Sequence, residues 1–328
     1  MRFLVIGGGS IGRRHITNLK FLGHTDIYCL KRQEDPVFAK EHAVKVVTDI
    51  ASIDLPVDAV IVCSPTSLHI DGIAIAVKLG ASILMEKPLI NTKEGIIEAK
   101  RNMLKFNGKF MIGFMLRFHP LLKKIKEVIA SEQLGKVYHA RFAFGSYLPN
   151  WHPWEDYKTS YASIQTLGGG VINTITHELD LIQSLFGNPI WVFSTAENFG
   201  MLDIEVEEMA DTIFGYVDKT VTLHLDYLQK DYERSIRILC EDGNITWDWH
   251  VNQLIIARHK GQKEVFSLEY FDVNKLYIDE LNEFINLISD PAASTELDFE
   301  HAIENAELTF FMHSSAVKGK KEIIEFIN

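Results

Sequence analysis

The sequence is poor in cysteine and in positive charge. Among 328 residues there are three cysteines, Cys29, Cys63 and Cys240, and no Cys-x-x-Cys pair. An odd number of widely spaced thiols argues against a disulfide framework or a zinc ribbon, and it is typical of a reducing cytoplasm. Lysine and arginine number 33 against 44 aspartates and glutamates, which gives a net charge of −11. Such an acidic chain repels phosphate backbones and anionic lipids, so we expect neither nucleic acid nor membrane as a partner.

Several motifs are also missing. No apolar run could span a bilayer, and the apolar stretch at 3–6 is too short for a signal peptide. His177-Glu178 lacks the second histidine of His-Glu-x-x-His and the other histidines are scattered, so we expect no metal site. The sequence contains no Gly-x-Ser-x-Gly motif and no Cys/His pair that would indicate nucleophilic catalysis. The balance of 47% hydrophobic and 23% charged residues excludes a mainly disordered chain and, with the length, predicts about two globular domains.

Up to about residue 120, short apolar stretches alternate with segments of helical pattern. Strands that are apolar almost throughout are typical of a parallel sheet covered on both faces, so we expect a doubly wound α/β domain at 1–120. Ser10 is expected to cap the first helix, which Gly23 ends. The expected strands are 2–6, 26–30, 44–47, 58–63, 83–85 and 110–113, and the expected helices are 10–22, 66–79 and 92–106.

Beyond Pro120 the hydrophobic period changes. A helix to about Ser131 precedes a two-faced strand at 137–145, and strand-like runs dominate from about 190 to 270. Asp242-Gly243-Asn244 indicates a hairpin. Helices are expected at 275–289 and about 299–313. The segment 121–328 is therefore expected to form an α+β domain with a large, mostly antiparallel open sheet.

The first strand is followed directly by Gly7-Gly8-Gly9-Ser10-Ile11-Gly12, which satisfies Gly-x-Gly-x-x-Gly. Glycines at this point permit a tight turn and let the backbone approach a pyrophosphate, while the N-terminus of the helix supplies free N–H groups. The strand–loop–helix context therefore predicts a Rossmann-type dinucleotide site, with Gly7, Gly9, Ser10, Ile11 and Gly12 against the cofactor.

The end of the second strand distinguishes NAD from NADP. NAD sites place an aspartate or glutamate there, about 20 residues after the glycine loop. This chain has Leu30-Lys31-Arg32 instead, and either cation can pair with a 2′-phosphate. We therefore favour NADP over NAD, with Lys31 and Arg32 as cofactor contacts; the alternative is two solvated surface bases.

Three further segments carry a resemblance. They are Glu86-Lys87-Pro88, the run from Ser64-Pro65 to His69, and the run from Gly113 through Arg117 to Pro120. Together with the glycine loop, they resemble the Gfo/Idh/MocA oxidoreductases, which include relatives of glucose–fructose oxidoreductase and inositol dehydrogenase. The resemblance implies an N-terminal Rossmann domain and a C-terminal α/β domain whose open sheet mediates homodimers or homotetramers.

The resemblance also implies site residues. Lys87 corresponds to the family's lysine near the nicotinamide and the substrate hydroxyl, and its ammonium could stabilise an alkoxide. His177, on a helix after Gly168-Gly169-Gly170, corresponds to the family's catalytic histidine, whose pKa suits proton transfer. Many relatives carry Asp four residues before that histidine. Asn173 stands there in this chain and cannot carry a proton, so we expect it to position the substrate.

The same resemblance places Ser64, Pro65, His69 and Glu86 in contact with the cofactor, as it does Lys87, and it places Arg117 in contact with the cofactor or the substrate. Asn173, His177, Asp180 and Ser184 are spaced 4, 3 and 4 apart and are expected to share one face of a single helix. We expect His15, one turn into the first helix, to be a local packing or hydrogen-bonding residue rather than a catalyst.

An aromatic loop at 147–161 precedes this helix. Aromatic faces stack on sugar rings, so Trp154 and Tyr157 are candidate substrate contacts. The alternatives are a surface loop held down by its tryptophans, or a contact between subunits.

The sequence thus favours an NAD(P)-dependent oxidoreductase that transfers hydride between nicotinamide and a hydroxyl-bearing carbon of a sugar, nucleotide sugar or cyclitol. Two alternatives remain: a redox-neutral NAD-dependent glycosidase, and a non-catalytic regulator that senses dinucleotide or sugar. Asn173, at the position where many relatives carry Asp, keeps the second alternative open.

Overall fold

The computed structural model describes residues 1–54 and 56–327, which form two compact units. Unit 1 comprises Met1–Met115 and Val273–Ala306, and unit 2 comprises Leu116–Asp272 and the residues from Glu307 onward. The chain therefore returns to its first unit after completing most of the second. The division into functional domains at 1–120 and 121–328 stays a prediction.

Unit 1 is built on a parallel sheet of six strands in the order β3-β2-β1-β4-β5-β6. The order reverses between β1 and β4, where ligands bind in open α/β sheets. Both strands are almost wholly buried, as expected for a sheet covered on two faces. The predicted Rossmann-type fold is thereby confirmed. The strands are β1 (Arg2–Ile6), β2 (Asp26–Leu30), β3 (Lys45–Val47), β4 (Ala59–Val62), β5 (Ser82–Glu86) and β6 (Phe110–Gly113).

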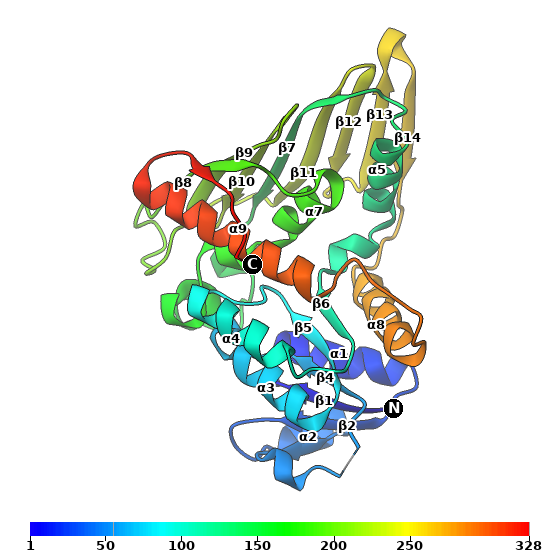
Figure 1. Cartoon of the computed structure of the whole chain (residues 1–328), viewed down its shortest axis with the longest axis vertical. Helices are drawn as coiled ribbons and strands as arrows, with labels where there is room; N and C mark the ends of the chain where they lie inside the picture. The colour runs from blue at the N-terminus through cyan, green and yellow to red at the C-terminus, as the bar shows by residue number, and fades with distance from the viewer. Residues whose placement is uncertain (55, 328) are drawn as a thin grey trace. The chain divides into compact units, whose positions relative to one another are not determined.

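Helices cover this sheet. Figure 1 shows α3 and α4 packed together on one side, with α1 and α8 together on the other. The predicted cap of α1 is wrong: Gly9 is the N-cap residue and makes no side-chain capping bond, while Ser10 is already helical. The helices are α1 (Ser10–Phe21), α2 (Pro36–His42), α3 (His69–Leu79), α4 (Lys93–Met103) and α8 (Asn274–Ser289), with short 3₁₀ turns at Ile50–Ser52 and Thr66–Leu68.

Unit 2 contains a sheet of nine strands in the order β14-β13-β12-β11-β7-β10-β9-β8-β15. Only the β7–β10 pair is parallel among the strands described, so the predicted mostly antiparallel sheet is confirmed, as is the β11–β12 hairpin. The sequence did not predict β14 or β15. The strands are β7 (Val137–Gly145), β8 (Trp191–Glu197), β9 (Met209–Gly215), β10 (Thr220–Asp226), β11 (Glu233–Cys240), β12 (Gly243–Asp248), β13 (Gln253–Arg258), β14 (Lys263–Ser267) and β15 (Glu322–Ile323).

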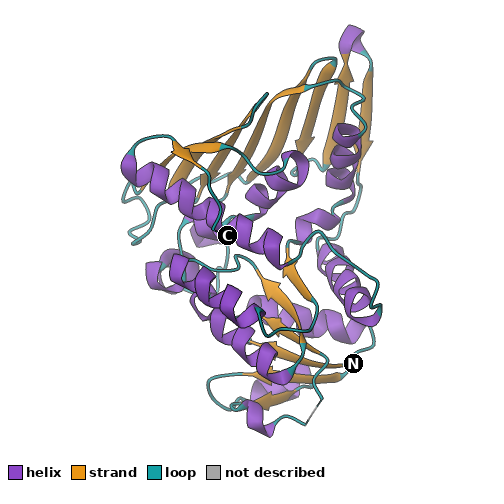
Figure 2. Ribbon diagram, in the orientation of Figure 1, coloured by secondary structure: helices purple, strands orange, loops and turns teal. Residues whose placement is uncertain are grey.

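One face of this sheet packs on helices and the other is open. Along β10, Val221, Leu223 and Leu225 are buried, whereas the alternate residues are partly or fully exposed up to His224. Figure 2 shows the helices lying against a single face. They are α5 (Pro120–Ala130), α6 (Val171–Thr174) and α7 (His177–Phe186), and α9 (Phe299–Lys318) runs from unit 1 into unit 2. Short 3₁₀ turns lie at Met115–Phe118, Leu148–Asn150, Tyr157–Thr159, Tyr161–Ser163, Gln165–Leu167 and His259–Gly261.

The helix predicted after the Gly168 run is broken in two. Helix α6 ends at Thr174, and Ile175 has the non-helical angles φ −105° and ψ 63°. Four of the five residues at 172–176 are β-branched, which lowers helix propensity. The prediction of one helix with Asn173 on the face of His177 is therefore wrong, because the two residues belong to different helices.

Among the described residues, no helix combines the length and apolar character that crossing a bilayer requires.

Candidate functional site

The glycine loop after β1 is shaped so that side chains do not fit. Gly7 has φ +103°, and a Cβ there would lie 2.8 Å from the carbonyl oxygen of Cys63. A Cβ on Gly12 would lie 2.1 Å from the carbonyl oxygen of Gly7. Because Gly9 makes no side-chain cap, the first N–H groups of α1 stay available to an anion. The loop therefore fits a dinucleotide pyrophosphate.

Three loops follow adjacent strands at the same edge of the parallel sheet. Gly7 follows β1, Ser64 follows β4, and Lys87 follows β5. The hydroxyl of Ser64 is buried and has no hydrogen-bond partner among the described residues. A buried polar atom of this kind needs a partner, which a ligand oxygen or N–H could supply.

His69 is buried beneath two of these loops and contacts the backbone of both. It is 1% exposed, and its ring nitrogens lie 2.9 Å from the carbonyl oxygen of Ser64 and 3.1 Å from that of Leu89. Burial lowers the pKa of the imidazole. The two contacts tie the Ser64-Pro65 turn to the segment after Lys87. The contacts of Ser64, Pro65 and His69 with a cofactor stay a prediction.

Glu86 and Lys87 begin a turn at the end of β5. Nε2 of His15 lies 2.8 Å from Oε1 of Glu86, which confirms His15 as a local hydrogen-bonding residue. The other oxygen of Glu86 accepts a hydrogen bond from the Lys87 backbone N–H at 3.3 Å. Lys87 is half-buried, and the peptide bond to Pro88 is cis. The Glu86 carboxylate is therefore engaged with the protein on both oxygens.

The cations at the end of β2 differ in their surroundings. Nζ of Lys31 lies 2.5 Å from Oδ2 of Asp35 and 4.1 Å from the ring centre of Phe38, whereas Arg32 is exposed. The other oxygen of Asp35 accepts from the Phe38 N–H and caps α2. The charge of Lys31 is thus balanced by a carboxylate four residues later, a partner that the predicted pairing with a 2′-phosphate did not include. Arg32 is the cation left facing solvent.

In unit 2, His177 is the first residue of α7 and is 8% exposed. One turn later, Oδ1 and Oδ2 of Asp180 accept hydrogen bonds from the Arg117 guanidinium at 2.8 and 2.7 Å, and Ser184 accepts a third at 2.5 Å. Asp180 is fully buried. The sequence predicts that Arg117 contacts the cofactor or the substrate. In the structure its guanidinium binds Asp180 and Ser184 of α7, and a contact with cofactor or substrate stays a prediction.

Asn173 has partners that the sequence did not reveal. Its Oδ1 lies 3.2 Å from Nε2 of His313 on α9, and its Nδ2 donates to the carbonyl oxygen of Gly169 at 3.1 Å. Burial lowers the pKa of His313. Because both ends of the amide are held, the orientation of Asn173 is fixed before any substrate arrives.

The aromatic loop is partly anchored. Trp151 donates from Nε1 to the Ser146 hydroxyl at 2.9 Å, and the Tyr157 hydroxyl donates to the carbonyl oxygen of Leu202 at 3.0 Å. Trp154, by contrast, is 77% exposed. Trp151 therefore anchors the loop, as in the alternative of a surface loop held down by its tryptophans. Trp154 is exposed and could contact a ligand or another chain.

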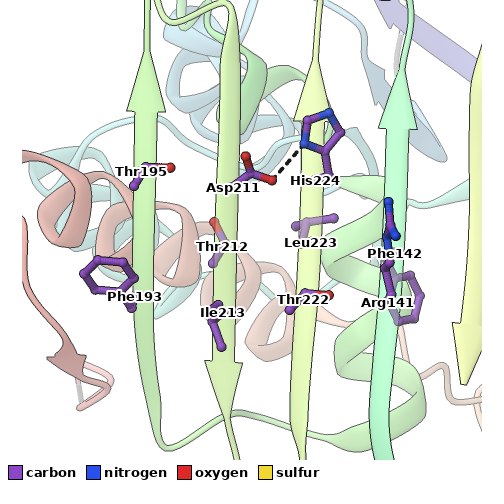
Figure 3. A pocket seen from close by; sticks show the side chains of 10 residues that line it. All are labelled: Arg141, Phe142, Phe193, Thr195, Asp211, Thr212, Ile213, Thr222, Leu223 and His224. Carbon is purple, nitrogen blue, oxygen red and sulfur yellow. Dashed lines mark hydrogen bonds and ion pairs between the residues drawn. The ribbon is translucent and has the colours of Figure 1, made fainter. Parts of the chain in front are cut away.

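A shallow hollow of about 320 Å³ lies on the open face of the sheet (Figure 3). His224 bridges two carboxylates there, with Nδ1 2.8 Å from Asp211 and Nε2 3.1 Å from Asp226. The bond to Asp226, supported by that to Asp211, raises the pKa of His224 to about 9 despite partial burial. The hollow is lined by Arg141, Phe142, Phe193, Thr195, Asp211, Thr212, Ile213, Thr222, Leu223 and His224.

Comparison with known families matches both parts of the chain. Residues 1–114 match the oxidoreductase family with an NAD-binding Rossmann fold, and residues 122–246 match the GFO/IDH/MocA C-terminal domain.

Curated relatives are similar over differing lengths. Myo-inositol 2-dehydrogenase of Thermotoga maritima is 25% identical over 90% of this chain and 91% of its own. An uncharacterized oxidoreductase, YrbE of Bacillus subtilis, is 26% identical over 57% of this chain, and the match spans about half of that protein (54%). Among solved structures, levoglucosan dehydrogenase in complex with NADH has a TM-score of 0.87 and 17% identity, with 100% of both chains covered. At that identity the likeness establishes the fold.

Proposed function

The chain belongs to the Gfo/Idh/MocA oxidoreductase family, and on that premise we propose that it transfers hydride between a nicotinamide dinucleotide and a hydroxyl-bearing carbon of a sugar or cyclitol. The observation that carries the proposal is the loop at 7–12, where a Cβ on Gly7 or Gly12 would clash with backbone oxygens. Inositol and levoglucosan dehydrogenases among the similar proteins support a polyhydroxylated substrate.

The proposed pyrophosphate contacts and Lys87 belong to unit 1. The bound dinucleotide would supply the hydride acceptor or donor, and Gly7, Gly9, Ser10, Ile11 and Gly12 would hold its pyrophosphate. Lys87 would bind the substrate oxygen and stabilise negative charge on it as hydride leaves the carbon.

The residues proposed for proton transfer and substrate positioning belong to unit 2. His177 would take the hydroxyl proton during oxidation and return it during reduction. Asn173 would orient the substrate, since its amide is already fixed by His313 and Gly169. Trp154 and Tyr157 would pack against the ring of the substrate.

A screen at 340 nm tests the function. Purified protein is incubated with cyclitols, sugars, anhydrosugars and nucleotide sugars, each with NAD⁺ and NADP⁺. We expect absorbance to rise with at least one member of these classes. Sugar release without net absorbance change would indicate the redox-neutral glycosidase, and dinucleotide binding without turnover on any substrate would indicate a sensor.

For the cofactor we propose a preference for NADP(H). The support is the absence of an acidic residue at the end of β2 and the exposed guanidinium of Arg32. Lys31 contributes less, because Asp35 balances its charge.

Replacing Arg32 with serine tests this preference. A charge-assisted hydrogen bond is worth about 1.5–3 kcal/mol, so R32S is expected to weaken NADPH binding by about tenfold or more. NADH binding is the internal control and should change by less than about twofold. Quenching of tryptophan fluorescence gives the Kd of wild type and R32S for each cofactor. A wild-type protein that binds NADH more tightly than NADPH contradicts the proposal.

We further propose that the open face of the sheet in unit 2 joins two copies of the chain, as a homodimer or within a homotetramer. This face carries half-exposed apolar side chains, Phe193 and Ile213, and Arg141 lines the same hollow from β7. Asp211 and His224 on the same face pair with each other at 2.8 Å, so their charges balance within one copy and leave the apolar side chains to make the contact.

Light scattering tests the interface. Wild type is expected at a multiple of the 37.4 kDa chain mass. I213D should shift the mass toward the monomer, because it buries a charge in the contact. V217D changes a residue that is 91% exposed between β9 and β10 and should leave the mass unchanged. A monomeric wild type contradicts the proposal.

A further inference from the structure

Three ionisable side chains meet inside unit 1, next to the turn that carries Lys87. One ring nitrogen of His15 and one oxygen from each of Glu86 and Glu280 lie within 4.8 Å of one another. His15 and Glu280 are fully buried, and the side chain of Glu86 is 12% exposed. The function proposed above uses neither His15 nor Glu280.

Glu280 reaches this place from a distant part of the sequence. Helix α8 packs on α1, where the side-chain amides of Asn18 and Asn274 exchange two hydrogen bonds of 3.2 and 2.9 Å. The ring of Tyr277 meets the ring of His15 edge to face. Glu280 lies three residues after Tyr277 and therefore on the same side of α8.

The carboxyl group of Glu280 is poorly suited to carry a charge. Both of its oxygens are buried and have no hydrogen-bond partner among the described residues. A Cβ on Gly113 would lie 3.5 Å from Oε1 of Glu280 and 3.6 Å from the carboxyl carbon of Glu86, so both carboxyls lie against the same backbone. An ionised carboxylate in such a place loses its hydration without compensation.

The charged neighbours add to this effect. Burial, then the nearby charges of Glu86 and Glu283, raise the pKa of Glu280 well above its usual range. The titratable groups around it from each packed element are His15 and Arg14 on α1, Cys63 after β4, Glu86 and Lys87 at the end of β5, and Tyr277 and Glu283 on α8 itself.

We propose that Glu280 is a positioning residue that stays a neutral carboxylic acid in the folded protein and holds the Glu86 carboxyl against His15, at the start of the turn that carries Lys87. Two carboxyls this close share one proton more readily than they both ionise. A neutral acid can donate its O–H toward a carboxylate, and such bonds are strong. Glu86 is hydrogen-bonded to His15, and the O–H of Glu280, which lies within 4.8 Å of that pair without a hydrogen bond of its own, would be available to the same carboxylate.

The pH dependence of stability tests the protonation state without cofactor, substrate or turnover, so it is independent of the proposed function. A folded-state pKa above the ordinary value of 4.5 means that folding takes up one proton at every pH between the two values. Wild-type stability is therefore lost as pH rises through that window. E280Q mimics the neutral acid and takes up no proton. The ratio of wild-type to E280Q folding constants should fall as pH rises above the ordinary pKa of 4.5, by up to about tenfold per pH unit for as long as Glu280 stays protonated in the folded protein.

The neighbouring carboxyl on α8 provides the control. Asp279 pairs with Lys275 at the surface, so the D279N curve is expected to run parallel to wild type. Infrared difference spectra at pH 7 should show the carbonyl band of a neutral acid in wild type and not in E280Q. Parallel wild-type and E280Q stability curves would overturn the proposal. So would a rise in unfolding temperature with added Zn²⁺ in wild type but not in E280Q, since a cation would then occupy the cluster.

Amide hydrogen exchange tests the positioning role. A glutamine amide at this position could donate to Glu86 and alanine could not, so exchange at the Glu86, Lys87 and Leu89 amides should rise at least tenfold in E280A and stay near wild type in E280Q. Exchange in β1 serves as the reference within the same unit. An equal rise in both variants, or no rise in E280A, would overturn the positioning role, and the pH comparison with E280Q holds even if E280A fails to fold.

Discussion

Methionine in place of Lys87 is expected to lower kcat by about 10²- to 10⁴-fold, the range for loss of a positioned proton-transfer or charge-stabilising group. Methionine keeps the length of the side chain and removes the ammonium. The dinucleotide should still bind, with Kd within about threefold of wild type, because the pyrophosphate loop at 7–12 is untouched. Single-turnover absorbance at 340 nm measures hydride transfer directly.

A second lysine provides the control for this substitution. Lys93 is exposed at the start of α4, six residues further along the same segment. K93M should retain wild-type kcat and the same Kd. Turnover by K87M at more than about a tenth of the wild-type rate would remove Lys87 from the chemistry.

The second large effect concerns stability. R117M is expected to lower the free energy of unfolding by about 3–5 kcal/mol, because it removes the guanidinium that balances the buried carboxylate of Asp180. The guanidinium is 11% exposed and the carboxylate 0%, so solvent screens the pair little. Urea denaturation at pH 7 measures the loss.

A double variant separates the ion pair from simple side-chain packing. R117M/D180N removes both charges of the buried pair, so it should recover at least about half of the lost stability. The dinucleotide Kd of folded R117M should be unchanged if Arg117 serves α7. A Kd raised tenfold, with little loss of stability, would instead assign Arg117 to the cofactor as the sequence suggested.

Elements with a strong hydrophobic period were predictable. The ends of β1, β2, β6 and β7 match the predicted strands, because glycine, proline or polar residues bound short apolar runs there. The break between α6 and α7 was missed, because an apolar period continues across residues 172–182 while the backbone does not. The long-range return of α8 to unit 1 leaves no local signal at all.

In the candidate site, too, features set by the local sequence were predictable and contacts between distant segments were not. The glycines at 7–12 were predictable because a tight turn restricts residue type, and the structure shows the backbone oxygens that impose the restriction. The partners of Arg117 and Asn173 come from other elements, which one sequence does not pair. Glu280 did leave a trace: it lies among Leu276, Leu281 and Phe284 on the buried stripe of α8. A carboxylate on an apolar stripe is a signal for a buried polar group.

The fate of one hydrogen tests the central claim most directly. A substrate found in the screen is deuterated at the carbon that bears the reacting hydroxyl and is incubated with the protein and oxidised dinucleotide. We predict that the deuterium moves to C4 of the nicotinamide, so that the reduced cofactor is one mass unit heavier. Product formed with an unlabelled reduced cofactor, or with the deuterium lost to water, would contradict direct hydride transfer.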